Sequence, residues 1–326
     1  MTRHRILYLL LVLLICAAAI ACLVSGSVSA PWADVWATLT LQPDVPHSWH
    51  YIIWHMRLPA LLTAALTGAS LGVAGLLLQS YFRNPLAGPS ILGITNGANL
   101  GVAIIITVTG THTGFGLVGA ALVGATVVLL LLLAVGRIVR QAVTLLIVGI
   151  LLSYLSSAIL TLIHYHASAD GVQALLLWGM GSFHQVGMTG MPVYALCTLL
   201  PLVASVWLIR PLNGWMLGPL YARSLGISVR GVRWGVLGIT GLICAVTTAW
   251  CGPIAFVGLS IPHVARMMFR TDNHRTLLPA SMLLGALCTL LCLWISTWPS
   301  SGQTLPINAI TPIFGIPVIL YVILKK

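Results

Sequence analysis

Hydrophobic residues run along the chain in long blocks that short polar stretches separate. Each block is roughly 20 residues long, the length that an α-helix needs to cross a bilayer. The pattern predicts ten membrane-spanning helices, at residues 6–28, 58–80, 91–110, 115–135, 142–165, 192–209, 234–250, 254–268, 277–298 and 306–324. The expected fold class is an all-α integral membrane protein in which residues 1–326 form a single transmembrane domain.

The first block has features of both a signal peptide and a retained helix. Arg3 and Arg5 precede it, and the small residues of Val28-Ser-Ala30 follow it, as in a cleavable signal. Its apolar run, which begins at Ile6, is longer than the roughly 7–15 residues of a signal peptide's hydrophobic core. The length favours a retained first helix.

Charged residues make up only 6% of the chain, and all of them except Arg266, near the end of the block at 254–268, lie between the hydrophobic blocks. With the N-terminus inside, the outer connections carry one arginine, Arg57, together with Asp34, Asp44 and Asp170. The other basic residues fall on the inner side: Arg3, Arg5, Arg83, Arg137, Arg140, Arg210, Arg223, Arg230, Arg233, Arg266, Arg270, Arg275, Lys325 and Lys326. This bias predicts that both termini are cytoplasmic.

This membrane topology explains the net charge of +11. Basic residues that bind nucleic acid cluster on one face with aromatic residues between them. Here they alternate with hydrophobic blocks, so we expect a lipid bilayer and no nucleic acid as a partner.

Three connections are too long to be simple turns. Residues 29–57 are outside and rich in tryptophan and histidine, which is typical of an interfacial aromatic belt. Residues 166–191 are also outside, and a short helix is plausible there. Residues 210–233 are inside, basic and interrupted by proline and glycine. That inner connection is the best candidate for docking a soluble partner.

Chemistry for ATP hydrolysis and for ion coupling is missing from the sequence. A P-loop needs a lysine after its glycines, and the only lysines are Lys325 and Lys326. Ion-coupled carriers usually have an acidic residue within the membrane, whereas the predicted spans contain none and the chain has no glutamate. The sequence therefore predicts no ATPase activity, and it disfavours ion coupling, although backbone carbonyls could still hold sodium.

Histidines are the candidate ligands for haem or a metal. Only His263 and His164 lie deep enough in predicted spans, and no second histidine pairs with either at matched depth. No Ser/His/acid triad or paired carboxylates can form within the membrane. We therefore expect no cofactor, no metal site and no catalytic residue.

Three segments interrupt the apolar sequence with motifs whose spacing packing alone does not explain. The first contains Arg57-Leu-Pro59, Gly68-Ala-Ser-Leu-Gly72 and Phe82-Arg-Asn-Pro-Leu-Ala-Gly-Pro89. The second is Tyr221-Ala-Arg-Ser-Leu-Gly-Ile227, and the third begins with Cys251-Gly-Pro-Ile-Ala-Phe-Val-Gly-Leu-Ser-Ile-Pro-His263. In order and spacing, over essentially the whole chain, they resemble the FecCD family of permease subunits, which serve ABC importers of iron–siderophores, haem and cobalamin.

The resemblance implies a ten-span permease of the type II ABC importer architecture in the inner membrane. Such a subunit dimerises with a second copy of itself and carries its substrate along the dimer axis. ATP-binding cassette ATPase subunits would bind below, and a periplasmic substrate-binding protein would dock above. The cargo would be an iron–siderophore, haem or cobalamin chelate, with a slight preference for an iron chelate.

The resemblance also assigns roles to particular residues. The coupling segment that receives the motion of the ATPase would comprise Tyr221, Ala222, Arg223, Ser224, Leu225 and Gly226. The cytoplasmic gate would include Asn84, Pro85 and Leu86. Arg57 would meet an acidic residue of the binding protein, although an interfacial anchor is an equally good interpretation of this arginine.

The sequence departs from the family pattern at several places. Family members often carry acidic residues where this chain has Leu217-Gly-Pro-Leu-Tyr221. They often have an Ala-Asp pair followed by an arginine where this chain has Cys292-Leu293 and the uncharged Thr297. The common Glu-Leu-Pro-x-Gly reads Thr304-Leu-Pro-Ile-Asn308. Docking of the binding protein is therefore expected to rest more on Arg57 and the outer aromatic residues.

Other function classes stay open at this point. An ion-coupled secondary carrier or a channel for a small solute is the main alternative, and a membrane-embedded haem enzyme is a weaker one. A copy of the importer subunit that no longer couples would also fit the departures.

Overall fold

The computed structural model of the protein describes residues 2–26, 28, 30–40, 42, 46–110, 114–139, 141–298 and 304–324. Four charged residues of the topology prediction lie outside the described residues: Asp44, Arg140, Lys325 and Lys326. The described part of the chain is helical and contains no strand, which confirms the predicted all-α fold class.

Each of the ten predicted spans corresponds to a helix. The helices are α1 (Thr2–Val24), α4 (Leu58–Phe82), α5 (Ile94–Thr109), α6 (Phe115–Ile138), α7 (Ala142–His166), α9 (Met191–Ser205), α12 (Val229–Cys251), α13 (Val257–Phe269), α14 (His274–Ser296) and α15 (Ile307–Leu324). Among the described residues, seven helical segments are long and apolar enough to cross a membrane. The helices α5, α13 and α15 are shorter.

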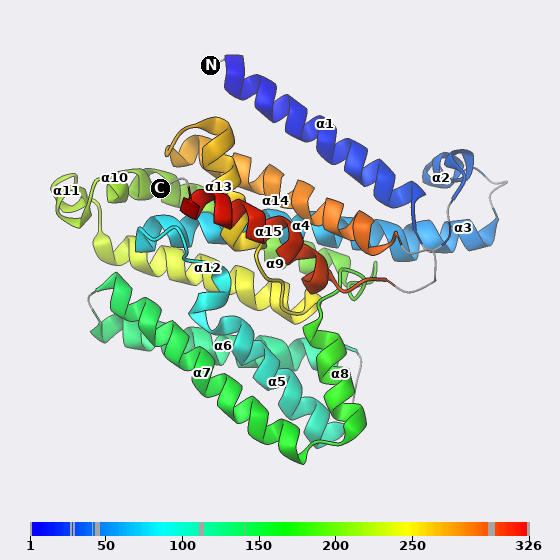
Figure 1. Cartoon of the computed structure of the whole chain (residues 1–326), viewed down its shortest axis with the longest axis horizontal. Coiled ribbons are helices and arrows are strands. Elements are labelled where there is room, and N and C mark those ends of the chain that lie inside the picture. Colours follow the sequence, from blue (N-terminus) through cyan, green and yellow to red (C-terminus); the bar gives the residue numbers. More distant parts are fainter. Residues whose placement is uncertain are drawn as a thin grey trace.

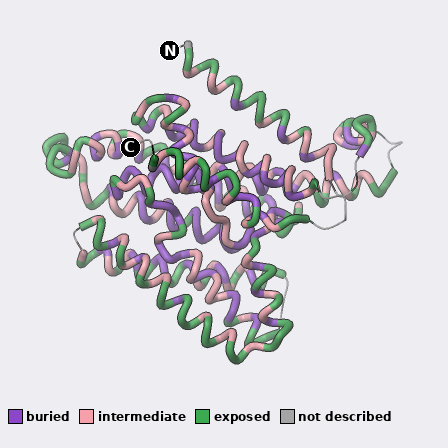
Figure 2. Tube along the Cα trace, in the orientation of Figure 1, coloured by how far each residue is buried: buried purple, intermediate pink, exposed green. Residues whose placement is uncertain are grey.

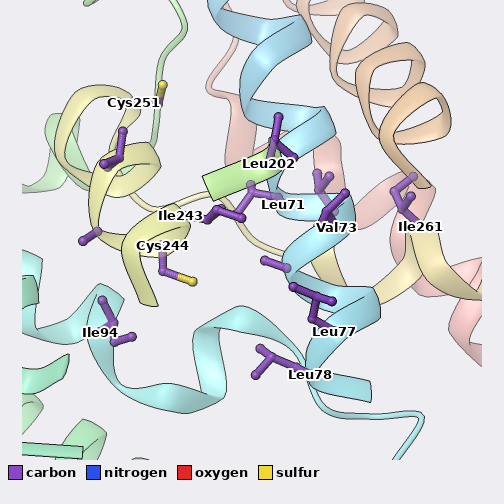
Figure 3. Close-up of a cluster of buried hydrophobic side chains, with 14 of the residues drawn as sticks. Leu71, Val73, Leu77, Leu78, Ile94, Leu202, Ile243, Cys244, Cys251 and Ile261 are labelled. Atoms are coloured by element: carbon purple, nitrogen blue, oxygen red, sulfur yellow. The ribbon is translucent and has the colours of Figure 1, made fainter. Parts of the chain in front are cut away.

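Helix α4 lies at the centre of the bundle and contacts α9, α12, α13 and α14 (Figure 1). Figure 2 shows it as a largely buried segment, while α1 and α7 carry many exposed residues. Leu71 and Leu77 of α4 lie in one apolar cluster with Leu202 of α9, Ile243 of α12 and Ile261 of α13 (Figure 3). A helix that is apolar all round is expected in such a position.

Glycines let α4 approach its neighbours at backbone distance. A Cβ on Gly68 would lie 2.2 Å from the carbonyl oxygen of Gly285 in α14. A Cβ on Gly75 would lie 1.6 Å from the carbonyl oxygen of Gly258 in α13. Small residues at four-residue spacing allow this kind of contact between membrane helices. Gly68 of the sequence motif and Gly75, three residues after it ends, therefore both serve close packing.

The outer connections contain further short helices. They are α2 (Trp32–Leu39), α3 (His47–Tyr51) and α8 (Ala169–Gly179), of which α8 is the short helix expected within residues 166–191. A π-helical stretch, Ile52–Arg57, joins α3 to α4 without a break. The helix therefore begins at His47, whereas the sequence analysis placed the start of this span at residue 58.

The inner connection between α9 and α12 is also helical in part. The 3-10 turn Val206–Leu208 continues α9 into α10 (Ile209–Met216), and α11 (Pro219–Ser224) follows. In Figure 1 both chain ends lie towards the left of the molecule with α10 and α11, whereas α2 and α3 lie at the right.

Helix α1 packs along α14 (Figure 1). The hydroxyl of Tyr8 donates a hydrogen bond to the carbonyl of Thr276 at 2.8 Å, and the thiol of Cys22 donates to the carbonyl of Leu290 at 3.4 Å. These contacts, near the two ends of α1, hold the helix against α14.

Candidate functional site

Helix α11 (Pro219–Ser224) occupies most of the segment assigned to coupling. Gly218 precedes it with φ of +114°, a conformation that other L-residues rarely adopt, and a proline follows in the first turn. At its end, the N–H group of Ile227 donates to the carbonyl of Ala222 at 2.9 Å. Gly226, with φ of +74°, takes the left-handed position of this Schellman motif. Two glycines therefore delimit a compact helical turn.

Most side chains of this turn point to solvent. Ala222 is buried, whereas Leu220 is 81% exposed and both Tyr221 and Leu225 are 56% exposed. Arg223 is exposed beside them. A cluster of exposed large apolar residues is typical of a surface that contacts another protein or a membrane, and aromatic and arginine residues are enriched in protein interfaces.

Helix α10 connects this turn to the inner end of α4. The indole N–H of Trp215 donates to the carbonyl of Tyr81 at 2.9 Å, and the two rings stack with centroids 5.5 Å apart. Tyr81 lies just before the last residue of α4 and three residues before Asn84. Displacement of α10 would therefore act directly on the end of α4.

A second connection runs through His274 at the start of α14. Its backbone N–H and its Nδ1–H donate to Oδ1 of Asn213 in α10 at 2.9 and 2.8 Å. Its Nε2 lies 2.6 Å from the hydroxyl oxygen of Ser80 in α4. The imidazole is buried and thereby joins α10, α14 and α4 at one point.

The residues assigned to the gate form a tight turn after α4. Arg83 adopts a left-handed conformation with φ of +49° and ends the helix. The side-chain oxygen of Asn84 accepts a hydrogen bond from the N–H of Leu86 at 2.9 Å, which is an Asx-turn. Leu86 is 46% exposed, while Asn84 and Pro85 are partly buried.

Helix α13 holds this turn in place. His263 donates from Nε2 to the carbonyl of Pro85 at 2.8 Å. Arg266 donates to Oε1 of Gln79 at 2.7 Å, and Nε2 of Gln79 donates to the carbonyl of Leu259 at 3.0 Å. The first and third sequence motifs therefore meet at the inner end of α4. His263 is hydrogen-bonded here to a backbone carbonyl of the gate turn.

Arg57 lies at the opposite end of α4, away from the coupling and gate residues. Its guanidinium donates to the carbonyls of Leu23, Val24 and Val28, at 3.1 Å for Val24. These carbonyls belong to the end of α1 and the residues after it, and Gly26 packs against the same guanidinium. The guanidinium therefore holds the end of α1 and the residues after it against the start of α4.

Asn308, one of the departures from the family pattern, joins three segments on the outer side. Its Nδ2 donates to the carbonyls of Gly179 at 3.1 Å and Pro253 at 2.7 Å, and its Oδ1 accepts from the N–H of Ala255 at 3.1 Å. It therefore fastens the start of α15 to the end of α8 and to the loop before α13.

Several residues of this arrangement were missed by the sequence analysis. Asn213, Trp215, Ser80 and Tyr81 carry no recognisable motif, and their partners are far apart in sequence. A tryptophan within the polar connection of residues 210–233 was the one available signal, because such a ring is expected to be anchored.

The comparisons with known proteins cover nearly the whole chain. The model of the FecCD transport family matches residues 9–325. The chain belongs to the FecCD transport family. This FecCD chain is 34% identical over 278 residues to the vitamin B12 import system permease protein BtuC of Salmonella paratyphi A, a match that covers 84% of each protein. The BtuC protein of Salmonella typhimurium matches with the same identity and coverage.

Solved structures agree with this assignment. A metal-chelate type ABC transporter in an inward-facing conformation superposes with a TM-score of 0.85 at 30% identity, over 97% of this FecCD chain and 98% of the other. PsaBC from Streptococcus pneumoniae superposes with a TM-score of 0.60 at 18% identity and shows likeness of fold alone. The protein is a multi-pass permease subunit of the ABC transporter class and not itself an enzyme.

Proposed function

We propose that this FecCD permease forms the membrane channel of an importer that moves an organic metal chelate from periplasm to cytoplasm. The exposed helix α11, tied to the gate turn through α10, is the observation that carries the proposal. It supplies a surface for a soluble ATPase and a short route from that surface to the end of α4.

The substrate class follows from the relatives. The BtuC proteins are named for vitamin B12 import, and the superposed transporter is described as a metal-chelate type. Cobalamin, haem and iron–siderophores are all organic metal chelates. The predicted spans of this chain contain no acidic residue, so the path is suited to a large cargo that is recognised by shape and apolar contact.

The partners follow from the surfaces. Helix α7 is the least buried of the long helices, with exposed residues such as Leu151, Leu155 and Leu162. We assign this apolar face to lipid and to a second copy of the chain. Helix α11 would receive the cassette ATPase. The outer residues Trp32 and Trp36, which are half exposed and stacked on each other, would help dock the periplasmic binding protein together with Arg57.

The roles of the gate residues are proposed on the same basis. Asn84, Pro85 and Leu86 would close the inner end of the path, since they form a turn that contacts α13 and directly follows α4. Movement of α10 would reach this turn through Trp215 and Tyr81. Both termini lie with α11 at one end of the molecule, which we assign to the cytoplasm of a cell whose inner membrane holds the protein.

Copurification with the ATPase tests the proposal. We expect the tagged permease to recover a cassette ATPase in equal amounts, and we expect the double variant Tyr221→Ala/Leu225→Ala to lose it. Both side chains are exposed, so the variant should keep its melting temperature. Tyr51→Ala, which removes an aromatic ring of nearly the same exposure (55%) from α3, is the matched control and should retain the ATPase.

Recovery of the ATPase by the double variant would contradict the assignment of α11 to coupling. Uptake by proteoliposomes that contain the permease without any ATPase would contradict the importer function itself. Where the complete importer is reconstituted, ATP-dependent uptake of labelled cobalamin, haem and a ferric siderophore would identify the chelate.

A further inference from the structure

A cavity rich in arginine lies where the end of α6 meets the start of α12. It measures about 320 Å³ and is lined by Arg137 of α6, Arg223 of α11, and Arg230, Arg233 and Trp234 of α12. It therefore borders the proposed coupling helix but contains none of the gate residues.

The arginines of the cavity differ in their partners. Arg233 forms part of the wall, since it donates to the carbonyls of Gly136 and Val139 at 2.8 and 2.6 Å and thereby holds α12 against the end of α6. Arg137 lies with its guanidinium 5.7 Å from the centre of the Trp234 ring. Arg230 is exposed at the rim.

No carboxylate balances this charge within the part of the chain that the structure describes. The one ion pair found there joins Arg266 to Asp272, on other elements. Asp34 and Asp170 lie in the outer connections, on α2 and α8. A cluster of guanidinium groups without acidic neighbours gains most from an external anion, especially from phosphate, which matches their planar geometry.

The backbone at the start of α12 adds to the positive potential. Ser228 caps the helix by accepting a hydrogen bond from the N–H of Gly231 at 3.0 Å. Val229 and Arg230, the first two residues of α12, line the cavity. The positive end of the helix dipole is therefore directed to the same space as the side-chain charges.

The surface next to the cavity is apolar and exposed. Along α6, Val127, Leu130, Leu131 and Ile138 are between 47 and 83% exposed, and they form a stripe at helical spacing that ends beside Arg137. Helix α6 is long and apolar enough to cross the membrane, so an exposed stripe along it is available to acyl chains. A ligand that fits both features is amphipathic, with an anionic head in the cavity and apolar chains along α6.

We propose that this cavity binds the phosphate headgroup of an anionic phospholipid from the membrane leaflet beside α11. The acyl chains lie along the exposed stripe of α6, and Trp234 occupies the interfacial depth that tryptophan favours. The site depends on the residues of this chain alone and requires no particular transport substrate.

Native mass spectrometry of the full-length chain, titrated with phosphatidylglycerol or phosphatidylcholine in mild detergent, tests the site. We expect phosphatidylglycerol to bind at least 5-fold more tightly than phosphatidylcholine. Arg137→Gln and Arg230→Gln should each weaken phosphatidylglycerol binding about 5-fold, the effect of removing one basic contact near a membrane surface. Arg275→Gln, an exposed arginine of α14 outside the cavity, is the matched control and should leave binding unchanged.

Equal binding of the two lipids, or equal losses in the control variant, would overturn the proposal. Competition by inorganic phosphate at the affinity of phosphatidylglycerol would show a site for free anions instead of lipid. This competition uses the wild-type chain, so it decides the question even if a glutamine variant fails to fold. Crosslinking of the cavity arginines to the ATPase, with no lipid bound, would assign them to the protein interface and also overturn the proposal.

Discussion

Arg57 shows how one side chain can close the end of a helix that it does not belong to. The last carbonyls of an α-helix have no partner within the helix, and a cation near them also interacts favourably with the helix dipole. The guanidinium of Arg57 bonds to the carbonyls of Leu23 and Val24 at the end of α1. It thereby ties the first helix to the beginning of α4.

Replacement of Arg57 tests this contribution. We expect Arg57→Ala to lower the stability of the detergent-solubilised protein by about 2 kcal/mol, because partly buried carbonyls at the end of α1 lose charge-assisted hydrogen bonds. Thermal unfolding would measure the loss, with the exposed Arg275→Ala as the control. An unchanged melting temperature together with weaker affinity for the binding protein would instead favour the docking role.

Asn308 marks a limit of sequence reasoning at the residue scale. The departure from the family's glycine was visible, but its meaning depends on Gly179, Pro253 and Ala255, which come together only in the folded chain. The same holds for Asn213 and His274. Hydrogen bonds between residues this far apart in sequence depend on how the helices pack, and no local sequence pattern predicts them.

At the scale of elements, the glycines of α4 were the most informative signal. Small residues four positions apart are typical of close helix contacts, and the backbone approaches of Gly68 and Gly72 to α14 agree with this pattern. The pair Gly231 and Gly235 behaves differently, since Gly235 accommodates only the side chain of Leu208. Spacing alone therefore identifies candidates for close approach without showing which of them face another helix.

Two glycine substitutions test the difference between a glycine that contacts another helix backbone and one that has open space beside it. Gly75→Ala should prevent stable folding, because its Cβ would lie 1.6 Å from a backbone oxygen of Gly258 that no side-chain rotation can move. Gly238→Ala in α12 meets no atom within 4 Å and should be neutral or stabilising by up to about 1 kcal/mol. Size-exclusion profiles and melting curves would compare them. A well-folded Gly75→Ala protein would contradict the close α4–α13 contact.

Element boundaries were harder to predict than element positions. The hydrophobic blocks located a helix at each of the ten predicted spans, and seven helical segments of the described residues are long and apolar enough to cross a membrane. The continuous helix from His47 and the division of the inner connection into α10 and α11 were missed. Both depend on polar segments, in which hydrophobic periodicity carries little information.

At the scale of the whole molecule, the distribution of basic residues agrees with the arrangement of the helix ends. The described arginines of the predicted cytoplasmic side lie at the helix ends that include α10, α11 and both chain ends, while Arg57 lies at the other end. Composition could predict this arrangement because the arginine bias acts over entire loops. It could not predict the cavity between α6 and α12, which forms only when those ends meet.

The orientation in the membrane is open to direct test. Tags at the N- and C-termini should both be cleaved by protease in inverted vesicles and both be protected in right-side-out vesicles, since the two chain ends lie at the same end of the molecule. A tag inserted after α2 should show the reverse pattern and serves as the control. Opposite accessibility of the two terminal tags would contradict the bundle topology.

The confinement of charge to the ends of the helices has an electrical consequence. Moving one elementary charge across a potential of 100 mV involves about 2.3 kcal/mol, so a transporter that carries charges through the membrane responds to voltage. The spans of this chain have almost none to move. Its conformational cycle should therefore run at nearly the same rate in energised and in depolarised membranes. Nucleotide and cargo should be the only sources of the free energy that drives the cycle.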